Sequence, residues 1–147
     1  MNPTDLTQRP PRSPRSRLGG FVILPRMLDK GRATIAGTNG EYSYACPLDE
    51  RFMNFAGIDA DAIKAQLVEG KGDGEILAWV LENSKTKPSE IEVQAWSLYV
   101  ANRVPNDIET RGYFNELQSK IGPKREDIVT WFDMLDLDDY VSFGGKA

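Results

Sequence analysis

The stretch LPRMLDKGRATIA, residues 24–36, decides the fold because it carries the clearest helical pattern in the chain. Leu24, Leu28 and Ile35 recur at the spacing of one helix face, so we expect a helix with one buried apolar side. The proline in its second position suits the first turn of a helix. Gly37 follows directly and is expected to end the helix.

The rest of the chain also favours helices. Asp49, Asp59 and Ser89 are candidate N-caps, since their short polar side chains can accept a hydrogen bond from a first helical turn. Apolar residues at helical spacing predict the inner faces of these later helices, among them Leu81, Ile91, Leu98 and Tyr99. We therefore expect an all-α, or nearly all-α, fold: a compact bundle of about five to six helices.

Residues 41–46 interrupt this helical pattern. Tyr42 and Tyr44 alternate with small residues before Cys46, which favours a short extended segment. The Thr, Asn and Gly that precede the segment indicate a turn. A small hairpin and an irregular loop both fit this part of the sequence.

The composition is that of one ordinary globular domain. The 147 residues are 40% hydrophobic and 10% aromatic, which is enough apolar material for a single core. Residues 1–18 differ, because four prolines alternate there with four of the 18 basic residues and favour an extended backbone. The sequence therefore predicts an extended basic arm over residues 1–18 and a single helical domain over residues 19–147.

Three roles are open for this arm. It is a loose tail, or it docks on the acidic body of its own or a neighbouring subunit, or it binds nucleic acid. Four positive charges on a protein with a formal net charge of −4 bind phosphate weakly. Nucleic acid is therefore the least favoured of the three, and we expect no nucleic-acid partner.

The chain lacks the usual equipment of catalysis and of metal binding. It has no His and one Cys, Cys46, which excludes a Cys–His nucleophile and a disulfide framework and fits a reducing compartment. Asp59 and Asp61 miss the pattern of a calcium loop, and Asp138 and Asp139 are expected to be exposed or paired with basic residues. No apolar run is long enough to span a bilayer, and the N-terminus lacks the apolar core of a secretory signal. We expect a cytoplasmic protein with no membrane partner, no metal site and no cofactor.

The early helix also carries a family resemblance. The segment LPRMLDKGRA (residues 24–33), followed by AGTNGEYSY and CPLDERFMNF and later by Gly-Asp-Gly-Glu leading to Trp79, resembles a bacterial family catalogued as domain of unknown function 5069. The resemblance covers roughly residues 15–135. It implies a mostly helical fold and no established activity. Gly31 stands out within this segment, because Gly is a poorer helix former than Ala by roughly 1 kcal/mol.

Charged residues of the early helix form the best candidate site. Arg26 and Lys30 share one face, while Asp29 and Arg32 lie on an adjoining one, and together they are expected opposite the apolar side. Convergent Arg and Lys side chains are what proteins use to bind carboxylates and phosphates. The other candidates, which can fold back over this face, are Glu41, Tyr42 and Tyr44. The alternatives are a solvated helix face, or ion pairs that lock the helix to the acidic C-terminal part.

With no catalytic residue identified, the sequence favours a non-catalytic cytoplasmic binding or interaction module with an anion-binding site on the early helix. Its expected partners are an anionic small molecule and a protein partner or second copy of the chain. The alternative is a small enzyme that acts on an anionic metabolite. In that case the three cations of the early helix bind the anion, while Asp29, Glu41 or Tyr42 moves protons.

Overall fold

The computed structural model describes residues 3–147 and contains seven α-helices among them, where the sequence suggested about five to six. The helices are α1 (Leu24–Ala36), α2 (Pro47–Ala56), α3 (Ala60–Val68), α4 (Asp73–Asn83), α5 (Glu90–Ala101), α6 (Ile108–Ile121) and α7 (Trp131–Ser142). Two short strands of the same part of the chain, β1 (Arg17–Leu18) and β2 (Phe21–Val22), pair in antiparallel fashion. The predicted all-α class, or nearly so, is confirmed.

Several helix boundaries lie where the sequence marks them. Gly37 ends α1 in the left-handed conformation, with a φ of 75°. Asp59 and Ser89 cap α3 and α5, each accepting a hydrogen bond of 3.2 Å from a backbone N–H of the first turn. The expectation that Asp49 caps α2 is wrong, because Cys46 is the N-cap and Asp49 lies inside the first turn.

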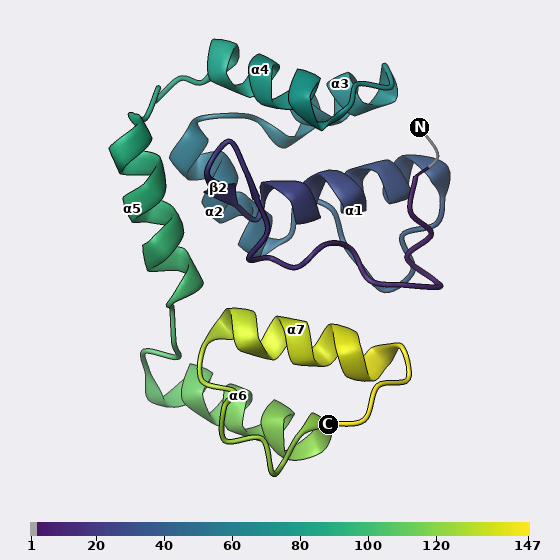
Figure 1. Ribbon diagram of the computed structural model, residues 1–147, viewed down its shortest axis with the longest axis vertical. Helices are drawn as coiled ribbons and strands as arrows, with labels where there is room; N and C mark the ends of the chain where they lie inside the picture. The colour runs from purple at the N-terminus through teal and green to yellow at the C-terminus, as the bar shows by residue number, and fades with distance from the viewer. Residues whose placement is uncertain (1–2) are drawn as a thin grey trace.

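Helix α1 lies at the centre of the molecule (Figure 1). In that view α3 and α4 lie above it and the α6–α7 pair lies below it, while α5 runs down one side and joins the two parts. The main core gathers around α1, β2 and α2, where the rings of Phe21 and Phe52 meet edge to face at 5.2 Å. A smaller core between α6 and α7 holds Phe114, Met134 and Leu137.

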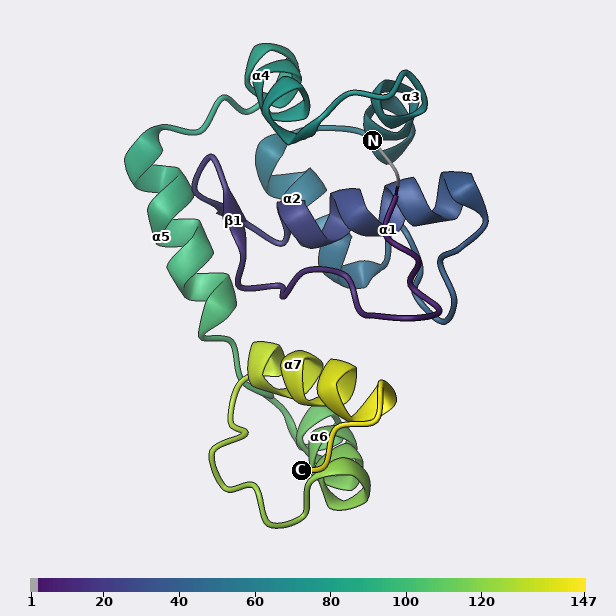
Figure 2. The same cartoon turned by 45° about the vertical axis from the view of Figure 1, so that its right-hand side comes forward.

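The described part of the arm packs against the rest of the chain. Residues 3–18 start between α3 and α1, cross α1 and then run past it on the side that faces α7 (Figure 2), and Leu6 is 1% exposed. Arg12 forms ion pairs with side chains of α1 and α4, and Arg15 forms ion pairs with α7. These residues of the arm therefore dock on the chain's own acidic groups. Residues 1–2 of the expected arm lie outside the described residues.

One open alternative is decided by the structure, and one local expectation is wrong. Residues 41–46 form turns and irregular backbone without a paired strand, so this segment is the irregular loop. Helix α5 is rotated from its expected face: Ile91 and Leu98 are 81% and 57% exposed, while Ser97 is buried. The inner face instead carries Val93 and Val100, with Ser97 between them, and the Ser97 hydroxyl donates to the carbonyl of Gly20 beside β2 (2.7 Å). The other apolar residues expected inside but found exposed are Ile35, Leu81 and Tyr99.

Candidate functional site

The charged residues of α1 lie on two sides of the helix with different surroundings. Arg26 and Lys30 are only 4% and 3% exposed, and both face a pocket beside α7. Asp29 and Arg32 contact the arm and α4 instead. The expected division into a buried apolar side and an outer charged side is therefore wrong, because α1 is covered on several sides by the arm, α3 and α7 (Figures 1 and 2).

Arg26 is held by a carboxylate of α7. Its two terminal nitrogens donate to the two carboxylate oxygens of Asp139 at 2.7 and 3.2 Å, and one of them also donates to the carbonyl of Arg12 at 3.1 Å. Burial lowers the pKa of Arg26, but the hydrogen bonds and charge of Asp139 outweigh burial and raise it. This is the arrangement in which ion pairs lock the early helix to the acidic C-terminal part.

Tyr42 completes the Arg26–Asp139 pair. Its ring lies over the guanidinium, with the guanidinium carbon 5.4 Å from the ring centroid, and its hydroxyl donates to Oδ1 of Asp139 at 2.7 Å. Burial, and then the hydrogen bond to Asp139, raise the pKa of the Tyr42 phenol. The phenol therefore keeps its proton and acts as a fixed hydrogen-bond donor.

Lys30 reaches the start of α2. Its Nζ lies 2.9 Å from Oδ2 of Asp49 and donates to Sγ of Cys46 across 3.2 Å. Asp49 is fully buried in the first turn of α2. The ammonium of Lys30 is therefore the group that neutralises Asp49, whose carboxylate has no other side-chain or backbone partner among residues 3–147.

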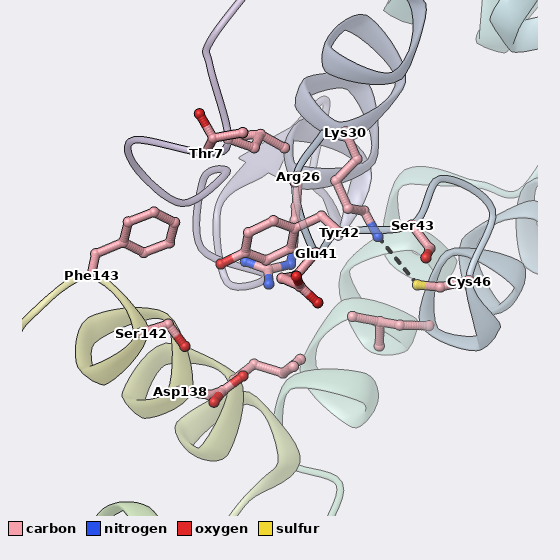
Figure 3. Close-up of a pocket in the computed structure, with 14 residues that line it drawn as sticks. Thr7, Arg26, Lys30, Glu41, Tyr42, Ser43, Cys46, Asp138, Ser142 and Phe143 are labelled. Atoms are coloured by element: carbon pink, nitrogen blue, oxygen red, sulfur yellow. Dashed lines mark hydrogen bonds between the residues drawn. The ribbon is translucent and has the colours of Figure 1, made fainter. Parts of the chain in front are cut away.

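A pocket of about 610 Å³ opens where the arm, α1, the loop before α2 and the end of α7 meet (Figure 3). Leu6, Leu48, Leu135 and Phe143 supply apolar wall. The polar and charged side chains that line it are Thr7, Arg26, Lys30, Glu41, Tyr42, Ser43, Cys46, Asp138 and Ser142. The volume and the mixture of an apolar wall with convergent polar groups are those of a small-molecule site.

Asp138 projects from α7 at the opposite side of the pocket from Lys30 and Cys46 (Figure 3). Burial, and then the charge of the neighbouring Asp139, raise the pKa of Asp138 by more than Arg26 lowers it. The pocket therefore contains a carboxylate in surroundings that disfavour its negative charge.

The other side of α1 carries an ion-pair network, which we define as Arg12, Asp29, Arg32 and Asp73. Arg12 contacts Asp29 at 3.0 Å and Asp73 at 2.8 Å, and Arg32 contacts Asp73 at 2.9 Å. Burial raises the pKa of Asp73, but its hydrogen bonds with the two arginines outweigh burial and lower it. The network joins the arm, α1 and α4, and its Asp29 and Arg32 do not line the pocket.

Tyr44 points away from the pocket. Its hydroxyl donates to the carbonyl of Ala60 at 2.7 Å, and burial raises the pKa of the phenol. Its ring packs on α1 beside Gly31, where an added Cβ would lie 3.0 Å from the ring and 2.6 Å from Leu67. Gly31 therefore stands in α1, despite its poor helix propensity, because Tyr44 and Leu67 occupy the space of a side chain.

Of the seven residues expected from the sequence, the pocket brings together Arg26, Lys30, Glu41 and Tyr42. The sequence missed Asp49, the buried carboxylate behind Lys30. Asp139 was expected to be exposed or paired with a basic residue, and its pairing with Arg26 fits that expectation. Asp49 carries no local signal, since an acid in the first turn of a helix is usually solvated.

Comparisons with known proteins identify the chain at the level of its family. Within residues 3–147, no helix has the length and apolar character needed to cross a bilayer. The search of curated proteins finds no match. The family model described as "Domain of unknown function (DUF5069)" matches residues 8–141, which include α1, the loop before α2 and nearly all of α7. The chain therefore belongs to the family of domain of unknown function 5069.

Proposed function

We propose that this protein is a binding protein whose small-molecule ligand occupies the pocket between α1, the loop before α2 and the end of α7. The observation that supports this most directly is the pocket itself: about 610 Å³, with one apolar wall and polar groups from several separate segments. Known ligand sites have volumes of roughly 300–1,000 Å³ and the same mixed lining. The pocket also lies between two parts of the fold, where ligand sites are common.

Binding is better supported than catalysis. Of the three side chains expected to move protons, Asp29 belongs to the ion-pair network and Tyr42 is tied to Asp139 with a raised pKa. Only Glu41 lines the pocket without such a bond among residues 3–147. Proton transfer by Asp29 or Tyr42, two of the three side chains on which the enzyme alternative relied, is therefore not supported by this geometry.

We place this binding function in the cytoplasm, because the single Cys46 is a free thiol and suits a reducing compartment. A protein partner or a second copy of the chain is a further candidate. It is favoured by the outer face of α5, where Ile91, Leu98 and Tyr99 are 81%, 57% and 64% exposed. Sedimentation of wild type and of Leu98→Glu tests whether this face associates.

A thermal-shift screen against organic amines, carboxylates and nucleotides tests the proposed pocket. A ligand at about a hundred times its Kd stabilises the folded state by roughly 2.7 kcal/mol, which moves the melting temperature measurably. Hits are repeated on Ser43→Trp, which places a large ring in the pocket lining. Ser119→Trp, on the exposed side of α6, is the matched control.

The proposal predicts hits that disappear in Ser43→Trp and persist in Ser119→Trp. Hits that survive in both variants would place the ligand elsewhere on the protein. A screen without hits on folded protein would remove the support for a small-molecule site.

A further inference from the structure

The two cations of the pocket are already neutralised by the fold. Arg26 is bidentate to Asp139, and Lys30 is paired with Asp49; all four side chains are at least nine-tenths buried. An anion that entered the pocket would have to compete with carboxylates that cannot move away. Separating a buried charge from its partner is strongly unfavourable. The cations that suggest an anion site in the sequence are therefore poor anion receptors in the structure.

The acids of the pocket are in the opposite situation. Glu41 comes from the loop before α2 and Asp138 from α7, and neither forms an ion pair with a cation of residues 3–147. The pocket wall and the two carboxylates directly behind it thus hold two cations and four acids, an excess of two negative charges. Burial, and then the charge of Asp139, raise the pKa of Asp138, while Arg26 lowers it, so this acid has both a negative and a positive neighbour.

The apolar side chains of the pocket indicate what the uncharged part of the ligand is. Leu6, Leu48, Leu135 and Phe143 line the same cavity, and they favour an apolar group. From this charge distribution and lining we infer that the pocket takes an organic amine, whose protonated amino group lies between Glu41 and Asp138 and whose apolar part packs on these side chains. This inference rests on the proposed function and names the ligand class of the same pocket.

Two compounds of matched shape and opposite charge test the ligand class: 2-phenylethylamine and 3-phenylpropionate. Each is titrated into the ¹⁵N-labelled full chain at pH 7, and the backbone amides of Ser43 and Ser142 report on the pocket. We expect the amine to shift both amides and to bind at least about tenfold more tightly than the carboxylate, because one charge-assisted hydrogen bond accounts for such a factor.

Neutral variants test whether the acids recognise the amine. Asp138→Asn combined with Glu41→Gln should weaken amine binding by at least about tenfold. Each acid is also changed singly. Glu126→Gln, on the exposed loop before α7, removes one charge outside the pocket and should leave the affinity of the amine unchanged.

Three results would overturn the inference. Tighter binding of 3-phenylpropionate at the same amides would reject the amine while leaving the small-molecule pocket in place. Amine binding that is unchanged in the double variant would show that the acids do not recognise it. The absence of shifts with either compound would also reject the amine. The proposed small-molecule pocket would be rejected as well only if the thermal-shift screen also gave no hits.

Discussion

The two charged sides of α1 carry similar residues at similar spacing, yet they serve the molecule differently. On the pocket side, Arg26 and Lys30 are almost fully buried and each meets a buried carboxylate. In the ion-pair network on the other side, the side chains of Asp29 and Arg32 of α1 are 13% and 12% exposed, and those of their partners Arg12 and Asp73 are 40% and 29% exposed. The two sides of α1 therefore differ in how deeply their ion pairs are buried, and not in the types of residue that form them.

The physical basis of this difference is the surrounding solvent. A buried charge that loses its partner is left without water or counter-charge, so removing one partner destabilises the fold strongly. Exposed pairs are screened and hydrated, and their loss has little effect. The same substitution should therefore have a large effect on the pocket side and a small one in the ion-pair network.

The largest effect is expected at the pocket-side pair of Arg26 and Asp139. Asp139→Ala should lower the free energy of unfolding by about 3–5 kcal/mol, because it leaves Arg26 buried and uncompensated. Urea unfolding at pH 7 measures this change. Asp127→Ala, which removes the exposed partner of Arg125, is the control and should change stability by less than about 1 kcal/mol.

A compensating variant separates charge from packing at this pair. Arg26→Met combined with Asp139→Leu should recover most of the stability lost in Asp139→Ala, since an apolar pair can replace a buried ion pair. If Asp139→Ala itself behaves like Asp127→Ala, the two sides of α1 do not differ in the way proposed here.

Gly31 of α1 should give the next largest effect on stability. Gly31→Ala should destabilise the protein by about 1–3 kcal/mol, because the new methyl group overlaps Leu67 and the ring of Tyr44. Thermal or urea unfolding measures it. Gly112→Ala in α6, where nothing lies within 4 Å of the added Cβ, should instead stabilise by up to about 1 kcal/mol. Equal stabilisation by both changes would contradict the close packing of Tyr44 on α1.

In the ion-pair network, Arg12→Ala should destabilise by about 1 kcal/mol or less, since its contacts with Asp29 and Asp73 are partly exposed. The effect should shrink further at 1 M salt, where exposed charges are screened. The unfolding free energy at low and high salt measures both. A loss as large as that of Asp139→Ala would mean that the arm is held as tightly as the pocket side.

The smallest effects should have opposite signs at Asp73 and Asp138. The pKa of Asp73 is lowered by folding, so its charge stabilises the protein at neutral pH, and this contribution is lost as the pH falls through that lowered value. The pKa of Asp138 is raised, so its charge opposes folding at neutral pH and this penalty disappears as the pH falls through the raised value.

Accordingly, Asp73→Asn should destabilise slightly at pH 7 and Asp138→Asn should stabilise slightly, each by less than about 1 kcal/mol. Both differences from wild type should diminish as the carboxylates of the wild-type protein become protonated. Unfolding free energies measured between pH 3 and pH 7 test this. The same sign for both variants at pH 7 would contradict the charge environments assigned to the two acids.

The sequence predicts helix positions well and helix orientation poorly. The bounds of α1 and the caps of α3 and α5 depend on local hydrogen bonds and backbone conformation, which neighbouring residues determine. Helix α5 has a second apolar pair at helical spacing, Val93 and Val100, and this pair faces the core beside Ser97, which bonds Gly20 at a separation of 77 positions. Apolar periodicity contains no information about such a contact.

The same limit applies to the site. Arg26, Lys30, Glu41 and Tyr42 could be predicted because they are close in sequence and chemically distinctive. Ion pairs with the acidic C-terminal part were one alternative from the sequence, but the particular pair could not be chosen, because Asp139 lies 113 positions from Arg26. Without the partners, a pair of buried and neutralised cations has the same sequence pattern as a free anion site.

The central claim is that the fold itself neutralises the buried cations of the pocket. Its most direct test is the proton-exchange rate of the Lys30 ammonium, observed by ¹H–¹⁵N NMR of the lysine side chains. If Asp49 and Cys46 hold Lys30 within the fold, its ammonium protons exchange slowly with water, and adding 3-phenylpropionate leaves its signal unchanged. Fast exchange like that of the exposed Lys120, together with a shift on adding the carboxylate, would show a free cation in the pocket and contradict the claim.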